Sequence, residues 1–175
     1  MATDPATDLA PLIARVQRLE DLEAIRSTWR DYCTRLDSAD WDGLGDVFTP
    51  DATLEIDGLS AALDGSYRGR ASIIDDLYKQ TGTVVSADAV PRFSTGHLST
   101  NMEIDLRGDE ATTLAYFFEI VANDQVLIGT YQHRFRRDRD RWRFAFLRIS
   151  IRYRARLEAT EVGGQPLANV LAKPI

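Results

Sequence analysis

The second half of the chain carries four strand-like runs in close succession, at about 93–107, 111–122, 126–137 and 141–155. The short segments between these runs are rich in Gly, Asp and Asn, which are typical residues of hairpin turns. Strands joined by such short turns pair antiparallel, so this half of the chain predicts an antiparallel meander. A sheet of this kind buries at least one face against another layer.

The first half of the chain supplies a helical layer. From about residue 8 to residue 36, apolar residues recur at steps of three and four, which predicts one long amphipathic helix. A second, short helix is expected at 44–48, where Leu and Val recur before Pro50 ends the pattern.

A short strand and a third helix complete the first half. Residues 53–57 alternate as a strand does, 58–69 form a turn-rich connection, and 71–80 carry apolar residues at helical spacing. Helices followed by an antiparallel meander indicate an α+β fold and not a doubly wound sheet.

The length and composition suit one domain. The chain has 175 residues, of which 44% are hydrophobic. We expect the domain to span 10–157, between a flexible N-terminus at 1–9 and a C-terminal tail at 158–175. Cys33 is the single cysteine, which excludes an internal disulfide and favours the reducing cytoplasm. No signal-peptide pattern and no long apolar run is present, so no membrane partner is expected.

Arginine is concentrated near the end of the meander. Residues 134–156 hold ten Arg against two Asp, although the whole chain has a net charge of −6. These Arg alternate with Phe and Trp, as the solvent-exposed face of a hairpin does. No glycine–aromatic RNA-binding signature accompanies them, so no nucleic-acid partner is expected.

The strand-like run at 114–121 is apolar on both faces. One face carries Leu114, Tyr116, Phe118 and Ile120, and the other carries mainly Ala, Phe and Val. One face should meet the helices, and the other should meet a second copy of the sheet. The pattern therefore predicts a homodimer or homotrimer formed through the sheet.

Several classes of site lack the residues they need. His97 and His133 are the only histidines, and no Cys or His pairs stand at ligand spacing, so no metal is expected. No glycine-rich phosphate loop and no serine nucleophile elbow is present. Cys33 lies on the apolar stripe of the first helix, which favours a buried, unreactive thiol.

Three residues remain as a candidate constellation: Tyr32, Asp37 and His97. Asp37 lies in the last turn of the first helix, where the helix dipole disfavours an anion, so a cation or an N–H donor should compensate. His97 lies near the start of a strand and can supply that donor. The alternative is that Asp37 only caps the local turn at 41–43.

These residues belong to a set of short motifs that together resemble a known family. The motifs are Tyr32-x-x-x-x-Asp37, Asp40-Trp-Asp42, Phe48-Thr-Pro-Asp-Ala52, Gly69-Arg-x-Ser-Ile73, His97-Leu-Ser-Thr-Asn101, Gly129-Thr-Tyr131 and Trp142-Arg-Phe144. In order and spacing, over about residues 15–155, they are similar to the SnoaL-like branch of the nuclear-transport-factor-like fold. That branch includes polyketide cyclases, scytalone dehydratases, a dehydrochlorinase and relatives of ketosteroid isomerase.

The resemblance implies a cone-shaped barrel, in which a curved, mostly antiparallel sheet wraps three N-terminal helices around an apolar cavity. It also implies catalysis without a metal or cofactor. The family's lyases use the His of an H-x-x-T-N motif as a base and a carboxylate at the end of the first helix to orient it, which correspond to His97 and Asp37. Tyr32 matches a pocket tyrosine of the dehydratases.

We therefore expect a cofactor-independent lyase or isomerase, acting on a small hydrophobic steroid, terpenoid or polyketide. The dehydratase, isomerase and cyclase reactions begin with the same proton removal, so the sequence does not choose among them. The alternatives are a non-catalytic ligand-binding protein and an oxygenase small-subunit-like protein. The expected substrate-binding residues are Tyr131, Arg148, Trp41, Phe48, Leu54, Leu77, Phe93, Met102, Tyr116, Phe118 and Phe146.

The alternation of side chains along the strands does not decide whether three of them point inward or outward. Strict alternation places His97 with polar residues on a solvent face, whereas the resemblance places it inside, with a bend at Gly96. Strict alternation places Arg148 on the same face as Trp142, Phe144 and Phe146. The apolar side then switches to Leu147, Ile149 and Ile151, which a bulge near 146–148 would explain, so whether Arg148 enters the pocket stays open. His133 is interpreted as an ordinary hairpin residue, with a role as a second pocket histidine as the alternative.

Overall fold

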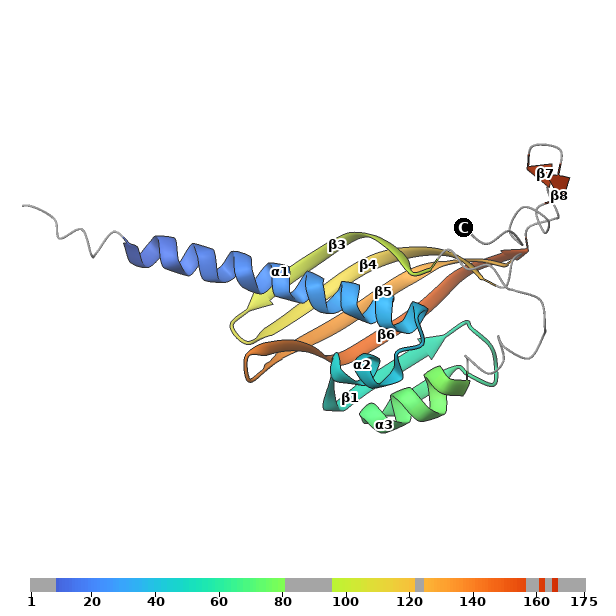
Figure 1. Ribbon diagram of the computed structural model, residues 1–175, viewed down its shortest axis with the longest axis horizontal. Helices are drawn as coiled ribbons and strands as arrows, with labels where there is room; N and C mark the ends of the chain where they lie inside the picture. Colours follow the sequence, from blue (N-terminus) through green and yellow to red (C-terminus); the bar gives the residue numbers. More distant parts are fainter. Residues whose placement is uncertain (1–8, 81–95, 122–124, 157–160, 163–164, 167–175) are drawn as a thin grey trace, which may run out of the picture.

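A six-stranded, curved sheet forms the body of the protein (Figure 1). The computed structural model describes residues 9–80, 96–121, 125–156, 161–162 and 165–166. The strand order is β2-β1-β6-β5-β4-β3, and every neighbouring pair is antiparallel except β1 and β6, which run parallel. The strands are β1 (Phe48–Asp57), β2 (Gly65–Arg68), β3 (Leu98–Arg107), β4 (Glu110–Val121), β5 (Gln125–Asp138) and β6 (Arg141–Arg156).

The predicted meander is confirmed, because β3 to β6 pair in sequence order. In the described part of the chain the sheet does not close into a barrel, and β2 and β3 are its edges. A separate two-stranded ladder joins residues 161–162 (β7) to 165–166 (β8). The fold is therefore α+β with a mixed, open, curved sheet. The predicted N-terminal segment (1–9) and C-terminal tail (158–175) lie mostly outside the described ranges.

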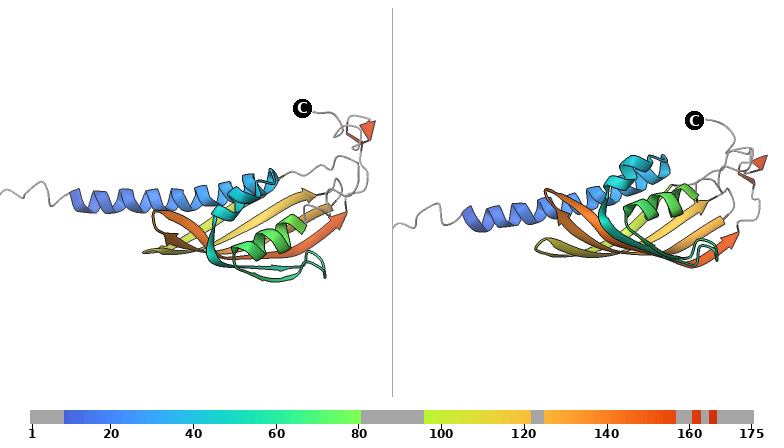
Figure 2. Two further views of the ribbon diagram at one scale, coloured as in Figure 1. Left: turned by 60° about the horizontal axis from the view of Figure 1, so that its bottom comes forward. Right: turned by 90° about the horizontal axis from the view of Figure 1, so that it is seen from below.

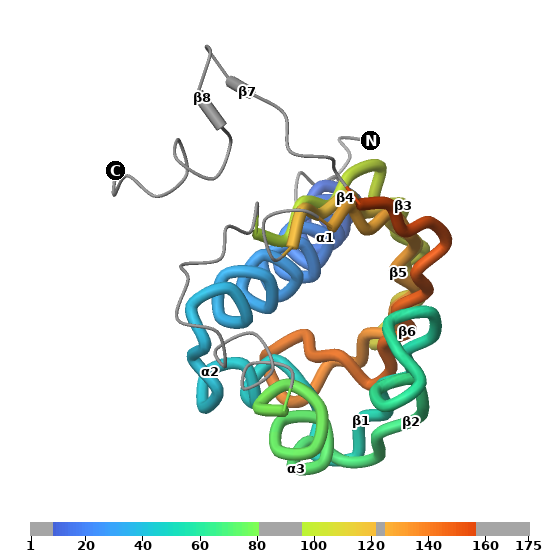
Figure 3. Tube along the Cα trace, turned by 90° about the vertical axis from the view of Figure 1, so that its right-hand side faces the viewer, coloured from blue at the N-terminus to red at the C-terminus, as the bar shows by residue number. Residues whose placement is uncertain are grey.

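All helices cover the same face of the sheet, and the sheet curves around them (Figures 2 and 3). They are α1 (Leu9–Asp37), α2 (Trp41–Asp46) and α3 (Arg70–Ser72), which continues as the π-helix η1 (Ile73–Tyr78). A π-helix is wider than an α-helix. All four apolar side chains of η1 are buried: Ile73, Ile74, Leu77 and Tyr78.

The second helix begins earlier than its apolar pattern predicted. The side chain of Asp40 accepts a hydrogen bond from the backbone of Gly43, which starts α2 at Trp41. The chain leaves the helix before Phe48, which pairs with Phe144 of β6. Phe48 and Pro50 therefore belong to a strand, because pairing with β6 takes over where the helix was expected.

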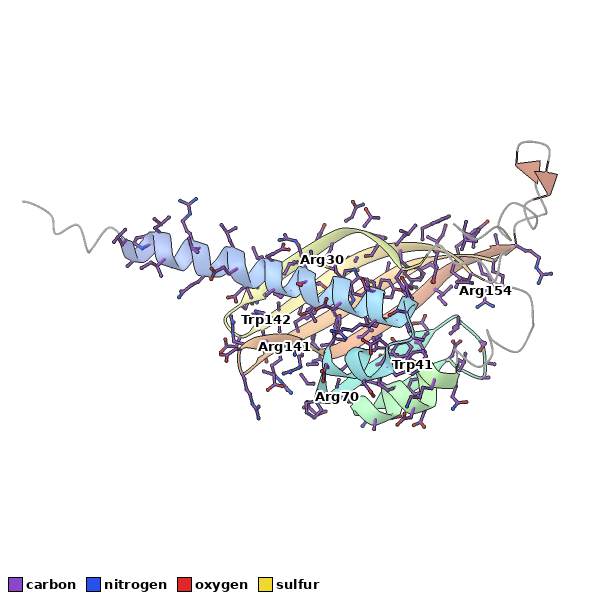
Figure 4. The ribbon with its side chains drawn as sticks, in the orientation of Figure 1. Arg30, Trp41, Arg70, Arg141, Trp142 and Arg154 are labelled. Carbon is purple, nitrogen blue, oxygen red and sulfur yellow. The ribbon has the colours of Figure 1, made fainter. Side chains whose placement is uncertain are left out.

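The first half of α1 projects beyond the sheet (Figure 1). Five of its apolar residues are exposed: Leu9, Leu12, Ile13, Val16 and Leu19. The second half is fastened to the sheet. Asp21 accepts hydrogen bonds from Arg137 and Trp142, and the hydroxyl of Thr28 donates to the backbone of Trp142. Figure 4 shows Trp142 beside α1.

Three β-bulges, one in β3 and two in β6 at Ala145 and Arg152, decide which side chains enter the core. In β3 the pairing with β4 shifts between Thr100 and Glu103, and Asn101 takes a positive φ of 54°. In β6 the pairing with β5 gains one residue at Ala145. Each bulge exchanges the inner and outer faces of the strand beyond it.

The outer face of the sheet carries exposed apolar side chains. Leu98, Phe118, Ile128 and Tyr153 stand opposite one another on four successive strands, and Tyr116 lies beside them. This arrangement confirms that β4 is apolar on both faces.

Several arginines of the arginine-rich hairpin form ion pairs within the fold. Arg136 contacts Asp51, Arg143 contacts Asp138, and Arg148 contacts Glu55. The pairs with Asp51 and Glu55 tie β5 and β6 to β1, which indicates a structural role for these arginines. Among the helices in the described ranges, none has the length and apolar run needed to cross a membrane.

Candidate active site

The end of α1 meets the start of β3 through one carboxylate. Asp37 is the last residue of α1, and Ala39 beyond it has a left-handed φ of 55°, which ends the helix. The carboxylate accepts one hydrogen bond from the backbone N–H of His97 at 3.1 Å and a second from its Nδ1 at 2.6 Å. Two N–H donors therefore compensate an anion at the unfavourable end of a helix dipole.

This contact fixes the state of the imidazole. A carboxylate on Nδ1 selects the tautomer that carries its proton there, so the lone pair of the neutral ring lies on Nε2. The described residues provide no hydrogen-bond partner for Nε2. The imidazole is mostly buried, with 14% of its side chain exposed, whereas 38% of the Asp37 side chain is exposed. His97 is thus held through Nδ1, while Nε2 has no partner among the described residues.

The pair shifts the pKa values of both groups. Burial lowers the pKa of His97, but the hydrogen bond that its Nδ1 donates to Asp37 and the charges of Glu119 and Asp37 outweigh it, so the net pKa is raised above its ordinary value of 6.5. Burial raises the pKa of Asp37, but its hydrogen bonds with His97 reverse the effect and hold that pKa below 3.8. Asp37 is therefore an anion at neutral pH, and the imidazole of His97 takes up a proton more readily than a free imidazole does.

Gly96 allows the strand to approach the carboxylate. Its φ is +72°, and a Cβ built there would lie 2.7 Å from Oδ2 of Asp37. A side chain at this position would push Asp37 away from His97. The bend that the resemblance required at Gly96 is confirmed, and the bulge at Asn101 explains why His97 and Met102 both face inward.

Tyr32 lies against the imidazole. Its ring is fully buried, with its centroid 6.0 Å from that of His97 in an edge-on arrangement. Its hydroxyl shares a 2.8 Å hydrogen bond with the hydroxyl of Tyr78 from η1. Burial raises the pKa of both hydroxyls, so both remain protonated at neutral pH.

The inner face of β5 adds Tyr131 and His133. Burial raises the pKa of Tyr131, whose ring packs against Trp29 and Phe117. His133 was interpreted as an ordinary hairpin residue, and this was wrong: it is buried among aromatic rings, and its Nδ1 contacts the hydroxyl of Thr113. Burial lowers the pKa of His133 to about 3, so this imidazole is neutral.

The structure divides the expected substrate-binding residues into three groups. Phe48, Leu54 and Leu77 are buried in the core with Tyr131, and Trp41 and Met102 are partly buried against it. Phe93 lies outside the described residues. Three residues were wrongly assigned to the interior, because alternation along β4 and the bulge at Ala145 turn them to the outer face: Tyr116, Phe118 and Phe146. Arg148, whose direction the sequence left open, also lies on the outer face.

Two inner residues were missed by the sequence reasoning. Tyr78 was expected only as an apolar helix residue, and its contact with Tyr32 depends on the π-helix. Glu119 shares the inner face of β4 with Ala115 and Phe117, a parity visible in the sequence. Glu119 was missed because a charged residue was not expected on the apolar inner face.

The remaining candidates carry no further chemistry. Burial raises the pKa of the Cys33 thiol to about 12, which keeps it protonated and unreactive, as expected. Within the described ranges, no three His, Cys, Asp or Glu side chains are grouped as metal ligands. A groove of about 420 Å³ lies between Glu103 and Arg134, away from His97.

Replacing Gly96 by Ala should separate Asp37 from His97. The added Cβ collides with the carboxylate, so the pKa of His97 should fall toward or below its ordinary value. NMR titration of the imidazole measures this shift. Gly108→Ala is the matched control, because Gly108 also has a positive φ but has open space around it. Equal His97 titration in both variants would contradict the assigned geometry.

Comparison with known proteins agrees with this architecture. The family model of the SnoaL-like domain matches residues 17–148. A search of curated proteins finds no significant match.

Solved structures with the same fold include three from Novosphingobium. The first is hexachlorocyclohexane dehydrochlorinase LinA-type3 from N. barchaimii (18% identity, TM-score 0.69, 85% of this chain and 97% of that chain). The others come from N. aromaticivorans: an NTF2-like protein with a cystatin-like fold (23%, 0.64, 86% and 92%) and a putative scytalone dehydratase (20%, 0.62, 82% and 91%). At these identities the likeness shows the fold. The family model covers most of the chain, and the protein therefore belongs to the SnoaL-like family.

Proposed function

We propose that this protein is a cofactor-independent lyase or isomerase of the dehydratase type. Its substrate is a small hydrophobic carbonyl or hydroxy compound, such as a steroid, terpenoid or polyketide. The observation that carries the proposal is the Asp37–His97 pair, whose Nδ1 is held by a carboxylate while Nε2 has no described partner. The SnoaL-like family includes dehydratases, isomerases and cyclases, which is consistent with this reaction class.

The proposed reaction begins with proton transfer from carbon to nitrogen. Nε2 of His97 removes a proton from the carbon next to a carbonyl group. The carboxylate of Asp37 stabilises the imidazolium that forms and keeps the ring oriented. A hydroxyl of Tyr32 or Tyr131, kept protonated by burial, donates a hydrogen bond to the enolate oxygen.

The fate of the enolate distinguishes the members of this reaction class. Loss of a β-substituent gives a dehydratase, return of the proton to another carbon gives an isomerase, and attack on a second carbonyl gives a cyclase. We place the reaction in the cytoplasm, since the unpaired Cys33 suits a reducing compartment.

His97→Ala should abolish turnover but spare binding. A panel of hydrophobic hydroxy ketones is first screened by the rise in melting temperature that binding produces. For the compounds that bind, we expect the variant to lose about 10²–10⁴-fold in rate, the usual contribution of a general base. Its affinity should stay within a few-fold. Binding without turnover in the unmodified protein would instead support a non-catalytic ligand-binding protein.

The rate should depend on pH through His97. Only the neutral ring is a base, so kcat/KM should fall as the pH drops through the pKa of His97, which lies above 6.5. Asp37→Asn removes groups that raise this pKa, and the acid limb should therefore move to lower pH while the maximum rate falls. Asp42→Asn, at an exposed position of α2, serves as the control and should keep the original profile. An unmoved acid limb in Asp37→Asn would contradict the pairing.

We also propose that the outer face of the sheet pairs with a second copy of the chain. Leu98, Phe118, Ile128 and Tyr153 form an exposed row across four strands, and a twofold axis would bury this row against itself. Phe118→Lys should lower the oligomer mass measured by light scattering. Thr112→Lys, on the same face of β4 but outside the row, should not. A monomeric unmodified protein would contradict this proposal.

A further inference from the structure

Glu119 lies beside the proposed base, His97, on the neighbouring strand of the sheet. β3 and β4 pair Leu98 with Phe118 and Ser99 with Phe117, so one further step of the same antiparallel register places His97 opposite Glu119. Directly opposite residues have Cβ atoms only about 4.5–5.5 Å apart. The side chains of His97 and Glu119 therefore lie next to each other on one face of the sheet.

Alternation along β4 turns Glu119 toward the helices. Ala115 and Phe117 are buried on the inner face, whereas Phe118 is 43% exposed on the outer face. Glu119 shares the parity of the first two, and its side chain is partly buried. The charge of this carboxyl acts on His97, Tyr131 and Cys33, all of which face the interior.

Glu119 differs from the other carboxyl group of the site. Asp37 is bound twice by His97, whereas Glu119 has neither a hydrogen bond nor an ion pair with any described residue. Burial raises the pKa of Glu119, the charge of His97 lowers it, and Asp37 raises it, so the net pKa lies above 4.5. The pKa of Asp37 is shifted in the opposite direction. Two carboxyl groups with opposite shifts are suited to different roles, one as a fixed anion and one as a proton donor.

We propose that Glu119 is the general acid of this site and delivers a proton to the oxygen that leaves the substrate. The inference rests on the proposed lyase function and narrows it to the elimination of water. The substrate class is then a β-hydroxy carbonyl compound, since its leaving hydroxyl lies one carbon beyond the carbon that His97 deprotonates.

His97 and Glu119 together accept and supply the protons of this reaction. Nε2 of His97 takes the α-proton, the electrons of that C–H bond form the C=C double bond, and the C–O bond to the hydroxyl breaks. The proton of the Glu119 carboxyl joins the departing oxygen, which leaves as water. The imidazolium and the Glu119 carboxylate that remain lie opposite each other, and proton transfer between them restores the starting state. The products are an α,β-unsaturated carbonyl compound and water, with no net oxidation.

The test compares two ketones that differ in their need for an acid. The aldol of acetone with benzaldehyde must lose a hydroxyl group, which requires a proton. The para-nitrophenoxy adduct of methyl vinyl ketone loses para-nitrophenolate, a stable anion that leaves without one. Glu119→Gln should slow the first reaction by about 10²–10⁴-fold, the usual contribution of a general acid, and the second by no more than a few-fold. Glu103→Gln, at an exposed position of β3, should slow neither.

The outcomes separate the acid role from the proposed function. If Glu119→Gln slows both reactions equally, or neither, the acid role is wrong while the lyase function stands. If the unmodified protein converts neither ketone nor any hydroxy ketone of the binding panel, the lyase function fails and the acid role fails with it.

A measurement without substrate tests the geometry itself. The Glu119 carboxyl can ionise when the imidazole is protonated, and its negative charge then stabilises the imidazolium, so Glu119→Gln should lower the NMR-titrated pKa of His97. Glu103→Gln should leave it unchanged. An unchanged His97 titration in Glu119→Gln would overturn the inference, because the carboxyl would then not face the base. Melting curves of both variants show whether each is folded at the temperature of the titration.

Discussion

The carboxylate of Asp37 joins the two parts of the chain that build the site. It receives the backbone N–H and the Nδ1 of His97, sixty positions later in the sequence. This one contact neutralises the end of α1, sets the path of the chain into β3 and selects the tautomer of the imidazole. It is possible because Gly96 has no side chain in the space that the carboxylate occupies. The proposed base therefore depends on a residue with no chemistry of its own.

The surrounding elements turn a simple ion pair into a site with several proton donors. Tyr32 from α1 lies edge-on to the imidazole, and η1 brings the hydroxyl of Tyr78 to that of Tyr32. β4 places Glu119 beside His97 on the inner face of the sheet. Burial keeps the tyrosines protonated and raises the pKa of Glu119, whereas direct hydrogen bonding keeps Asp37 ionised. Environment, more than residue type, thus divides the acidic groups into anions and donors.

The bulges also have a large effect on which side chains face the interior, although each adds only one residue to a strand. One extra residue at Asn101 allows His97 and Met102 to share the inner face, although strict alternation separates them. One extra residue at Ala145 sends Phe146 and Arg148 outward, although both were candidates for substrate binding. The result is an inner face dominated by aromatic rings and an outer face with the paired arginines.

The sequence by itself determined the α+β architecture, the limits of the meander and the identity of the Asp37–His97 pair. Hydrophobic periodicity and turn residues are local, and motif order preserves residue positions, so these features can be read without coordinates. Only the tertiary structure decided which side of each strand meets the helices, because a single bulge inverts the pattern beyond it. It also decided the burial of His133, the place of Tyr78 and the position of Glu119 opposite His97. These depend on packing between segments far apart in the chain, and local patterns carry no information about such contacts.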